Sequence, residues 1–267
     1  MRQVDVDLSF YGIPEWLVGL LFLALMVVAC ESGYRLGLRS RAAEKTRALV
    51  PTVSGSILAL LGLLLGFSMS MSVSRYDTRR RLVLEEANAI EAAYLRMQAL
   101  PSPESAELQE TLRQYAANRL HVSETVNDNQ KLQLGKKEDA RLQNELWSRA
   151  AAVARKDPQS VPAGILLESL NEVIDLENSR WIGFVAHLPE SVVYVDALMG
   201  LLAVLMVGYG FGMTGHRHAL SKALLIVAIF MVMSLIVELD YPYSGVVRVS
   251  QKPLVDLQYR LAAPSGH

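Results

Sequence analysis

Four serines at every second position, from Ser68 to Ser74, stand out among the residues of this sequence that could do chemistry. They alternate with methionine and valine in the segment GFSMSMSVSR, residues 66–75, which ends in Arg75. Strict alternation of polar and apolar residues is typical of a half-buried strand. In a membrane helix, the same hydroxyls could bond backbone carbonyls between packed helices, or they could line a path for water or ions. The element that carries the segment decides between these roles.

Acidic side chains within or beside apolar runs form a second group of candidates. Asp196 lies inside the run VVYVDALMG, and Glu238 and Asp240 lie at the end of the last apolar run. Ionisable groups near a membrane invite a functional interpretation, but such acids also mark where a helix leaves the lipid. For Asp196, an interfacial position and a buried pair with an arginine are both open, and Arg75 is the natural partner.

Catalytic and metal-binding patterns are weak in this sequence. His216 and His218 could be metal ligands, but no nearby acid or cysteine completes a tetrahedral set, and a solvated basic turn explains them better. Glu85, Glu86 and Glu91 are interpreted as surface charges of a solvated helix. The sequence contains no GxSxG, P-loop, HExxH or GxGxxG motif. We therefore expect no enzyme activity, no metal and no cofactor.

The composition and the N-terminus argue against nucleic-acid binding, an internal disulfide and a cleaved signal peptide. The net charge is −1, with no overwhelmingly basic face, so nucleic acid is not an expected partner. The single cysteine, Cys30, cannot form an internal disulfide and is expected to be a small buried hydrophobe. Residues 1–16 lack the basic region and cleavage site of a signal peptide, so the first apolar run should remain as an anchor.

Four apolar runs predict four membrane-spanning helices, with membrane lipid as a partner. The chain has 267 residues, 51% of them hydrophobic, and a spanning helix needs about 20 mostly apolar residues. The runs cover residues 13–30, 53–73, 192–213 and 223–237, and the last qualifies when it is extended to 219–239. GFSMSMSVSR continues the second run. A lone strand cannot cross lipid with its backbone groups unpaired, so we expect a helix there.

Helical geometry divides the serines between two faces, because residues two apart lie about 200° apart on a helix. Ser68 and Ser72 share one face, and Ser70 and Ser74 share another. The helix is expected to continue into the polar middle, since no proline occurs from Thr52 to Leu100. Pro51 and Pro101 are expected to mark its ends.

The predicted fold is all-α, with four membrane helices and a helical extramembrane bundle. Within the middle, helices are expected at 102–122, 137–156 and 164–186, and residues 33–51 and 127–137 are interpreted as connections. The domains are then an N-terminal helix pair, a helical domain, a C-terminal helix pair and a tail, at residues 1–74, 75–189, 190–240 and 241–267.

Two motifs resemble bestrophins, anion channels with bacterial relatives, and the chain looks still more like a bacterial group described as bestrophin-like. In bestrophins the second span leads to Leu-Gly-Phe, and an arginine followed by an aromatic residue comes eight residues after the Phe. Acidic residues, Pro-aromatic-Gly and Pro-Leu follow the last span. The matching residues are Leu65, Gly66, Phe67, Arg75 and Tyr76, then Glu238, Asp240, Pro242, Tyr243, Gly245, Pro253 and Leu254, with Ser244 inserted before the glycine.

The resemblance implies a homopentamer in which five copies of the second helix surround an axial pore. The pore would pass small inorganic ions, and anions are the expected class. The pore neck would be formed by Ala59, Leu63 and Phe67, whose spacing places them on one face. Apolar constrictions of this kind can gate by dewetting. The polar residues flanking the neck would be Ser70, Ser74 and Arg75. Ordinary helix packing is the alternative role for all of them.

The sequence also departs from the bestrophin pattern. Beyond Gly245 it has one acid, Asp256, so calcium gating is not expected. Ser68 and Met69 stand where bacterial bestrophins often carry Arg-Asn, so ion selectivity cannot be carried over. Basic residues do not decide the orientation. The resemblance places the termini and the helical middle in the cytoplasm and the protein in the plasma (inner) membrane as a multi-pass protein. The alternative function is a non-conducting, membrane-anchored sensing or interaction protein of the same fold.

Overall fold

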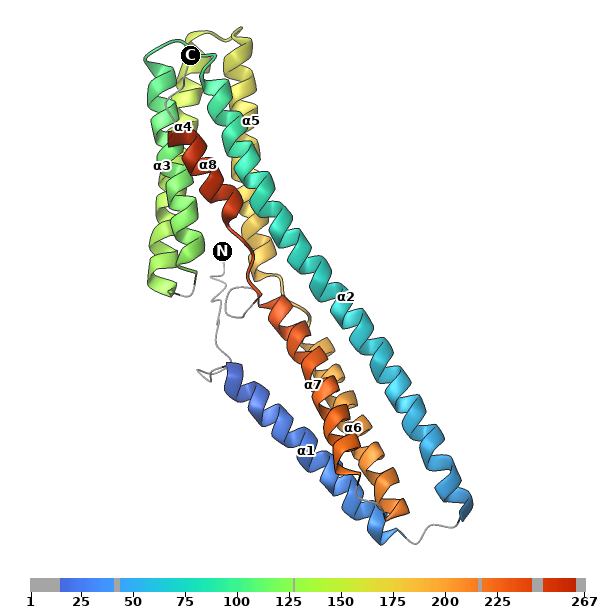
Figure 1. The fold of residues 1–267 in the computed structure, drawn as a ribbon. Helices are drawn as coiled ribbons and strands as arrows, with labels where there is room; N and C mark the ends of the chain where they lie inside the picture. The colour runs from blue at the N-terminus through green and yellow to red at the C-terminus, as the bar shows by residue number, and fades with distance from the viewer. Residues whose placement is uncertain (1–14, 41–43, 127, 216–217, 242–246, 263–267) are drawn as a thin grey trace. The chain divides into compact units, whose positions relative to one another are not determined.

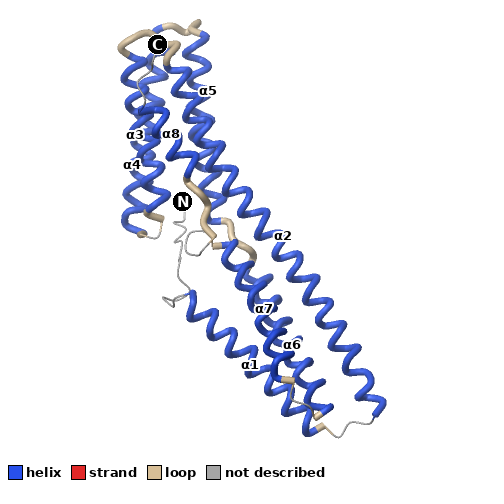
Figure 2. The backbone as a smooth tube through the Cα atoms, viewed as in Figure 1, coloured by secondary structure: helices blue, strands red, loops and turns tan. Residues whose placement is uncertain are grey.

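A computed structural model of the chain describes residues 15–40, 44–126, 128–215, 218–241 and 247–262. All regular structure in these ranges is helical, and Figure 2 shows no strand in them. The helices are α1 (Glu15–Arg39), α2 (Glu44–Met97), α3 (Glu104–Glu124), α4 (Asn129–Lys156), α5 (Val161–Val185), α6 (Glu190–Thr214), α7 (Ala219–Asp240) and α8 (Lys252–Ala262) (Figure 1). The all-α prediction is confirmed.

The chain divides into two compact units. The first, here called the apolar unit, consists of Met1–Arg75 and His187–Tyr241. The second, the polar unit, consists of Tyr76–Ala186 and Pro242–His267. The boundary falls inside α2, so α2 contributes to both units.

The apolar unit contains α1, the first part of α2, α6 and α7. By length and composition, four helical stretches in the described residues could cross a membrane: Trp16–Arg39, Ala48–Met97, Val161–Thr214 and Ala219–Asp240. Each includes most or all of one of the four predicted apolar runs, and the first stretch begins at Trp16, inside the run 13–30. The outside of the unit is also apolar, since Leu21, Leu224 and Met231 are largely exposed. Large exposed apolar surfaces of this kind suit a lipid environment.

A close contact between α1 and α6 organises the apolar unit. Gly33 and Gly37 on α1, and Gly208 and Gly212 on α6, are each four residues apart. A methyl group at either glycine of α1 would overlap a backbone carbonyl oxygen of α6, and one at either glycine of α6 would overlap a carbonyl oxygen of α1. The contacts advance along both helices together, so the helices run parallel. Small residues at such spacing let membrane helices approach closely.

The polar unit has its own hydrophobic core, to which all of its helices contribute. On α2 the buried positions include Val83, Ile90 and Met97, which repeat with helical spacing. Side chains cap two helix starts: Asp128 accepts a hydrogen bond from the backbone N–H of Lys131, and Ser160 accepts one from Ala163. The rest of the core comes from α3, α4, α5 and α8, chiefly Leu108, Leu112, Tyr115, Leu142, Leu146, Leu166, Leu170, Leu254, Leu257 and Leu261.

The structure corrects three predicted element boundaries. α1 extends to Arg39 and α2 begins at Glu44, so most of residues 33–51 is helical rather than a connection. Pro51 lies inside α2 instead of marking its start, a position that membrane helices tolerate when neighbouring groups satisfy the freed carbonyl. Most of residues 127–137 belongs to α4, which starts at Asn129 behind its Asp128 cap. The long second helix is confirmed as far as Met97.

Candidate pore helix and buried polar sites

The three predicted neck residues lie on one exposed face of α2 within the apolar unit. Leu63 is 55% exposed and Phe67 is 61% exposed, and Ala59 is exposed one turn earlier. The opposite face, which includes Leu61 and Leu65, is buried in the unit's core. The described helices of the single chain therefore leave the neck positions largely uncovered.

The alternating serines divide between these two faces, as helical geometry predicts. Ser70 and Ser74 are exposed, on the same side of α2 as the neck positions, and Arg75 is half-buried. Ser68 and Ser72 are buried against the rest of the apolar unit. The predicted helix and its two serine faces are confirmed, whereas the pore-flanking role of Ser70, Ser74 and Arg75 stays a prediction.

Ser68 forms a hydrogen bond with Asp196, the acid inside the third apolar run. The Ser68 hydroxyl donates a hydrogen bond of 2.5 Å to Oδ2 of Asp196 on α6, and both residues are buried. The suggested pairing of Asp196 with Arg75 is therefore replaced by a serine contact. A hydroxyl can reach this carboxylate because Ser68 lies on the packed face of α2, whereas Arg75 lies further along α2, at the end of the first segment of the apolar unit.

Ser72, one turn along the same face, differs from Ser68. Its side chain has no exposed surface, and its Oγ has no hydrogen-bond partner among the described residues. A buried hydroxyl without a partner destabilises a fold. Ser72 is therefore a candidate for stabilising replacement.

Asp240, at the end of α7, is buried and binds the segment that connects α5 to α6. Its carboxylate accepts the backbone N–H of Leu188, at 3.1 Å to Oδ1 and 2.9 Å to Oδ2. His187 Nδ1 lies 3.5 Å from Oδ2, and the His187 ring stacks on Tyr241 with 4.5 Å between centroids. Asp240 thus orders the segment that leads into α6, rather than marking an exposed helix end.

The remaining residues of the predicted motif after the last span are less well defined. Glu238 is half-buried. Pro242, Tyr243 and Gly245 lie outside the described residues. Of the histidine pair considered as metal ligands, His216 also lies outside them. In the described ranges no group of three or more His, Cys, Asp or Glu side chains is placed to hold a metal ion.

A network of buried charges lies at the centre of the polar unit. Glu86 of α2 has no exposed surface, and it accepts hydrogen bonds from Arg119 of α3, at 2.5 Å, and from Arg180 of α5. Arg119 also donates to Asp139 of α4 at 2.8 Å, and it lies 3.5 Å from Glu177 of α5. Four helices therefore meet through one set of ion pairs.

The interpretation of Glu86 as a surface charge was wrong. Glu86 lies three residues after Val83 and four before Ile90, so it occupies the apolar stripe of α2 and faces the core. Burial by itself would raise the pKa of Glu86, but the charges and hydrogen bonds of Arg119 and Arg180 outweigh it, and the pKa is lowered. Its place in the stripe was the available signal, whereas nothing local in the sequence pointed to its arginine partners.

Comparison with known proteins decides the family. The family described as "Bestrophin-like domain" matches residues 20–254, which is most of the chain. The chain belongs to the Bestrophin-like family. The predicted resemblance is thereby confirmed, and together with the four apolar helices it makes this chain a membrane protein.

Solved structures agree with this bestrophin-like assignment at the level of the fold. A bacterial bestrophin homologue from Klebsiella pneumoniae is similar with a TM-score of 0.64 and 14% sequence identity, covering 92% of this chain and 96% of that one. A variant of the same homologue gives a TM-score of 0.66 and 13% identity, over 92% and 94% of the two chains. No curated protein matches the chain.

Proposed function

We propose that this bestrophin-like protein is a homopentameric channel that passes small inorganic ions through an axial pore lined by α2. Anions are the ions that we expect it to pass. It would be a multi-pass protein of the plasma (inner) membrane, with the polar unit in the cytoplasm. The neck of the pore would consist of Ala59, Leu63 and Phe67. Ser70, Ser74 and Arg75 would lie between the neck and the cytoplasmic mouth.

The observation that carries this proposal is the exposed face of α2. Leu63 and Phe67 are large apolar side chains whose surface no other described helix of the apolar unit covers. An inward-facing ring of such side chains would form an apolar constriction that dewets when closed. Lipid could also cover them, so their role depends on a ring of neighbouring copies.

Oligomeric state is the first experiment for this proposal. The detergent-purified full-length protein would be measured by native mass spectrometry or by particle symmetry. A pentamer supports the axial pore, because five copies of α2 can then surround one axis. A monomer or dimer leaves no such ring and overturns the pore.

Ion flux into liposomes containing the purified protein is the second experiment. Chloride flux above that of empty liposomes supports a channel. A pentamer without flux of any small ion would instead favour a membrane-anchored sensing or interaction protein of the same fold. Calcium dependence is not expected, because the tail beyond Gly245 carries one acid, Asp256.

A further inference from the structure

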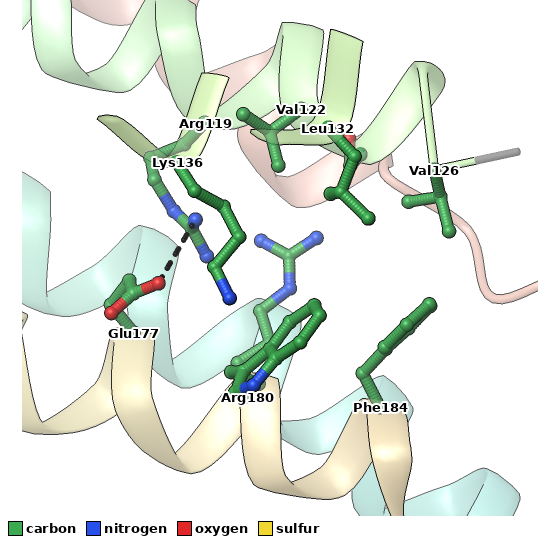
Figure 3. A pocket seen from close by; sticks show the side chains of 10 residues that line it. Arg119, Val122, Val126, Leu132, Lys136, Glu177, Arg180 and Phe184 are labelled. Carbon is green, nitrogen blue, oxygen red and sulfur yellow. Dashed lines mark ion pairs between the residues drawn. The ribbon is translucent and has the colours of Figure 1, made fainter. Parts of the chain in front are cut away.

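A small pocket opens between α3, α4 and α5 of the polar unit. Its volume is about 40 Å³. Val122 and Leu132 lie on one side of it and Phe184 on the other (Figure 3). Trp181 also lines the pocket, and its ring stacks on that of Phe184 with 5.2 Å between centroids. The charged residues Lys136, Arg119, Arg180 and Glu177 complete the lining. The pocket therefore combines apolar walls with three cations and one carboxylate.

Lys136 is the cation best placed to take a ligand. Its Nζ lies 3.3 Å from the centroid of the Trp181 ring, so the ammonium is held by a cation–π contact. In the described part of the chain, this contact is its only short-range partner, whereas Arg119 and Arg180 are engaged by carboxylates. Burial lowers the pKa of Lys136, and the charge of Glu177 partly offsets this effect. The ammonium thus retains hydrogen-bond donors while it is partly removed from water.

Of the three carboxylates in the network of buried charges, only Glu177 is among the residues that line the pocket. Glu86 and Asp139 bind Arg119 but do not line the cavity, and Glu177 is the carboxylate on its wall. With Glu177 ionised, the three cations are balanced by three carboxylates. Protonation of Glu177 would leave one positive charge unbalanced beside the cavity. A monovalent anion could neutralise that charge.

We propose that this pocket binds one small monovalent anion, of the size class of chloride, bromide or nitrate, on the Lys136 ammonium, and that Glu177 takes up a proton as the anion binds. The volume supports this class, because about 10–15 Å³ of such cavity volume holds one water molecule, so the pocket has room for a small ion with a few water molecules. A nucleotide or a phosphorylated metabolite does not fit. The site lies within the polar unit and does not depend on the proposed pore.

The groups that face Glu177 explain why anion binding should be coupled to its protonation. They are Arg119 from α3, Lys136 and Asp139 from α4, Glu86 from α2, and Arg180 on α5 itself. Burial raises the pKa of Glu177, Arg119 lowers it, and Asp139 and Glu86 raise it, with a net upward shift. An anion in the pocket would raise it further. Anion binding should therefore strengthen as the pH falls.

The test uses quenching of Trp181 fluorescence by bromide. The full-length protein would carry Trp16→Phe and Trp147→Phe, which leave Trp181 as its one tryptophan. Bromide would replace gluconate at constant ionic strength, since gluconate is too large for the cavity. Saturable quenching, tighter at mildly acidic than at alkaline pH, is the expected result. Quenching that rises linearly with bromide at every pH would overturn the proposal.

Two variants and a matched control locate the site. Lys136→Met keeps a long unbranched side chain beside Trp181 but removes the charge, and it should weaken binding by about tenfold or more. Lys137→Met changes an exposed neighbour and should leave binding unchanged. Glu177→Gln should bind bromide with little pH dependence. If circular dichroism and gel filtration show that Lys136→Met does not fold, the pH dependence of bromide binding to Glu177→Gln decides. Unchanged pH dependence in that variant, or unweakened binding in a folded Lys136→Met, contradicts the assignment.

Discussion

Glu86 binds two guanidinium groups in the core of the polar unit, and its replacement tests what the charge network contributes. Glu86→Gln should lower the free energy of unfolding by about 3–5 kcal/mol, because Arg119 and Arg180 then lose a buried counter-charge. Chemical unfolding followed by circular dichroism measures the change. The matched control is Glu85→Gln, whose exposed side chain pairs with Arg81 at 3.6 Å and should contribute less than about 1 kcal/mol. Equal effects of the two changes would contradict a central role for Glu86.

The lowered pKa of Glu86 also predicts a dependence of stability on pH. A carboxylate whose pKa is lower in the folded state stabilises the fold above its unfolded pKa, and that stabilisation is lost as the pH falls through the folded value. The stability gap between the wild-type protein and Glu86→Gln should therefore narrow in acid. Thermal unfolding of both proteins across the acidic range measures it. A gap that stays constant down to strongly acidic pH would rule out this contribution.

The two buried serines of α2 should respond to alanine in opposite ways. Ser68→Ala removes the hydrogen bond between Ser68 and the Asp196 carboxylate, and should destabilise the apolar unit by about 1–3 kcal/mol. Ser72→Ala removes a buried hydroxyl that has no partner among the described residues, and should be neutral or stabilising by about 1 kcal/mol. Thermal unfolding in detergent distinguishes them, with the exposed Ser70→Ala as control. Destabilisation by Ser72→Ala equal to that by Ser68→Ala would show that Ser72 has a partner.

At the scale of elements, the contact between α1 and α6 depends on backbone approach. Gly208→Ala places a methyl group onto a carbonyl oxygen of α1 and should destabilise the apolar unit by about 1–3 kcal/mol. Gly210→Ala, two residues away, would meet the Val50 side chain at an ordinary distance of 3.5 Å. It should be neutral or slightly stabilising, since alanine favours a helix by up to about 1 kcal/mol over glycine. Melting temperatures in detergent measure both, and equal losses would contradict the close contact.

Sequence periodicity predicted most helices but not all of their ends. The apolar runs identified the helices that could cross a membrane, and the absence of proline predicted the length of α2, because hydrophobic length and backbone geometry are local properties. The start of α4, within residues 127–137, was not predicted, because the polar composition of this segment resembles a connection and its burial depends on α3. α8 was not predicted either. Its Leu254, Leu257 and Leu261 have helical spacing, but a helix of 11 residues is marginal by itself and is stabilised by burying these leucines in the polar unit's core.

At the scale of the whole molecule, the proposed pore predicts the effect of neck substitutions. Phe67→Ala and Leu63→Ala should raise ion leak or conductance, because a smaller apolar ring dewets less readily. Liposome flux and single-channel recording measure this effect. The matched control is Leu224→Ala on α7, where the side chain is 62% exposed, close to the 61% of Phe67. Currents unchanged in both neck variants would remove the neck assignment, and an equal rise in the control would attribute the effect to the lipid-facing surface.

The sequence by itself determined the helical class, the four helices that are apolar enough to cross a membrane, and the family, because hydrophobic length, helical period and motif order are written along the chain. It also determined that the serines at 68 and 72 face away from those at 70 and 74, since that follows from helix geometry alone. The tertiary structure decided which of these faces is buried and that Asp196 accepts a hydrogen bond from a serine hydroxyl instead of pairing with Arg75. It also decided that Glu86 joins two other helices, α3 and α5, to its own. These outcomes depend on side chains more than 30 positions apart, whose meeting is set by packing and the pairing of buried charge.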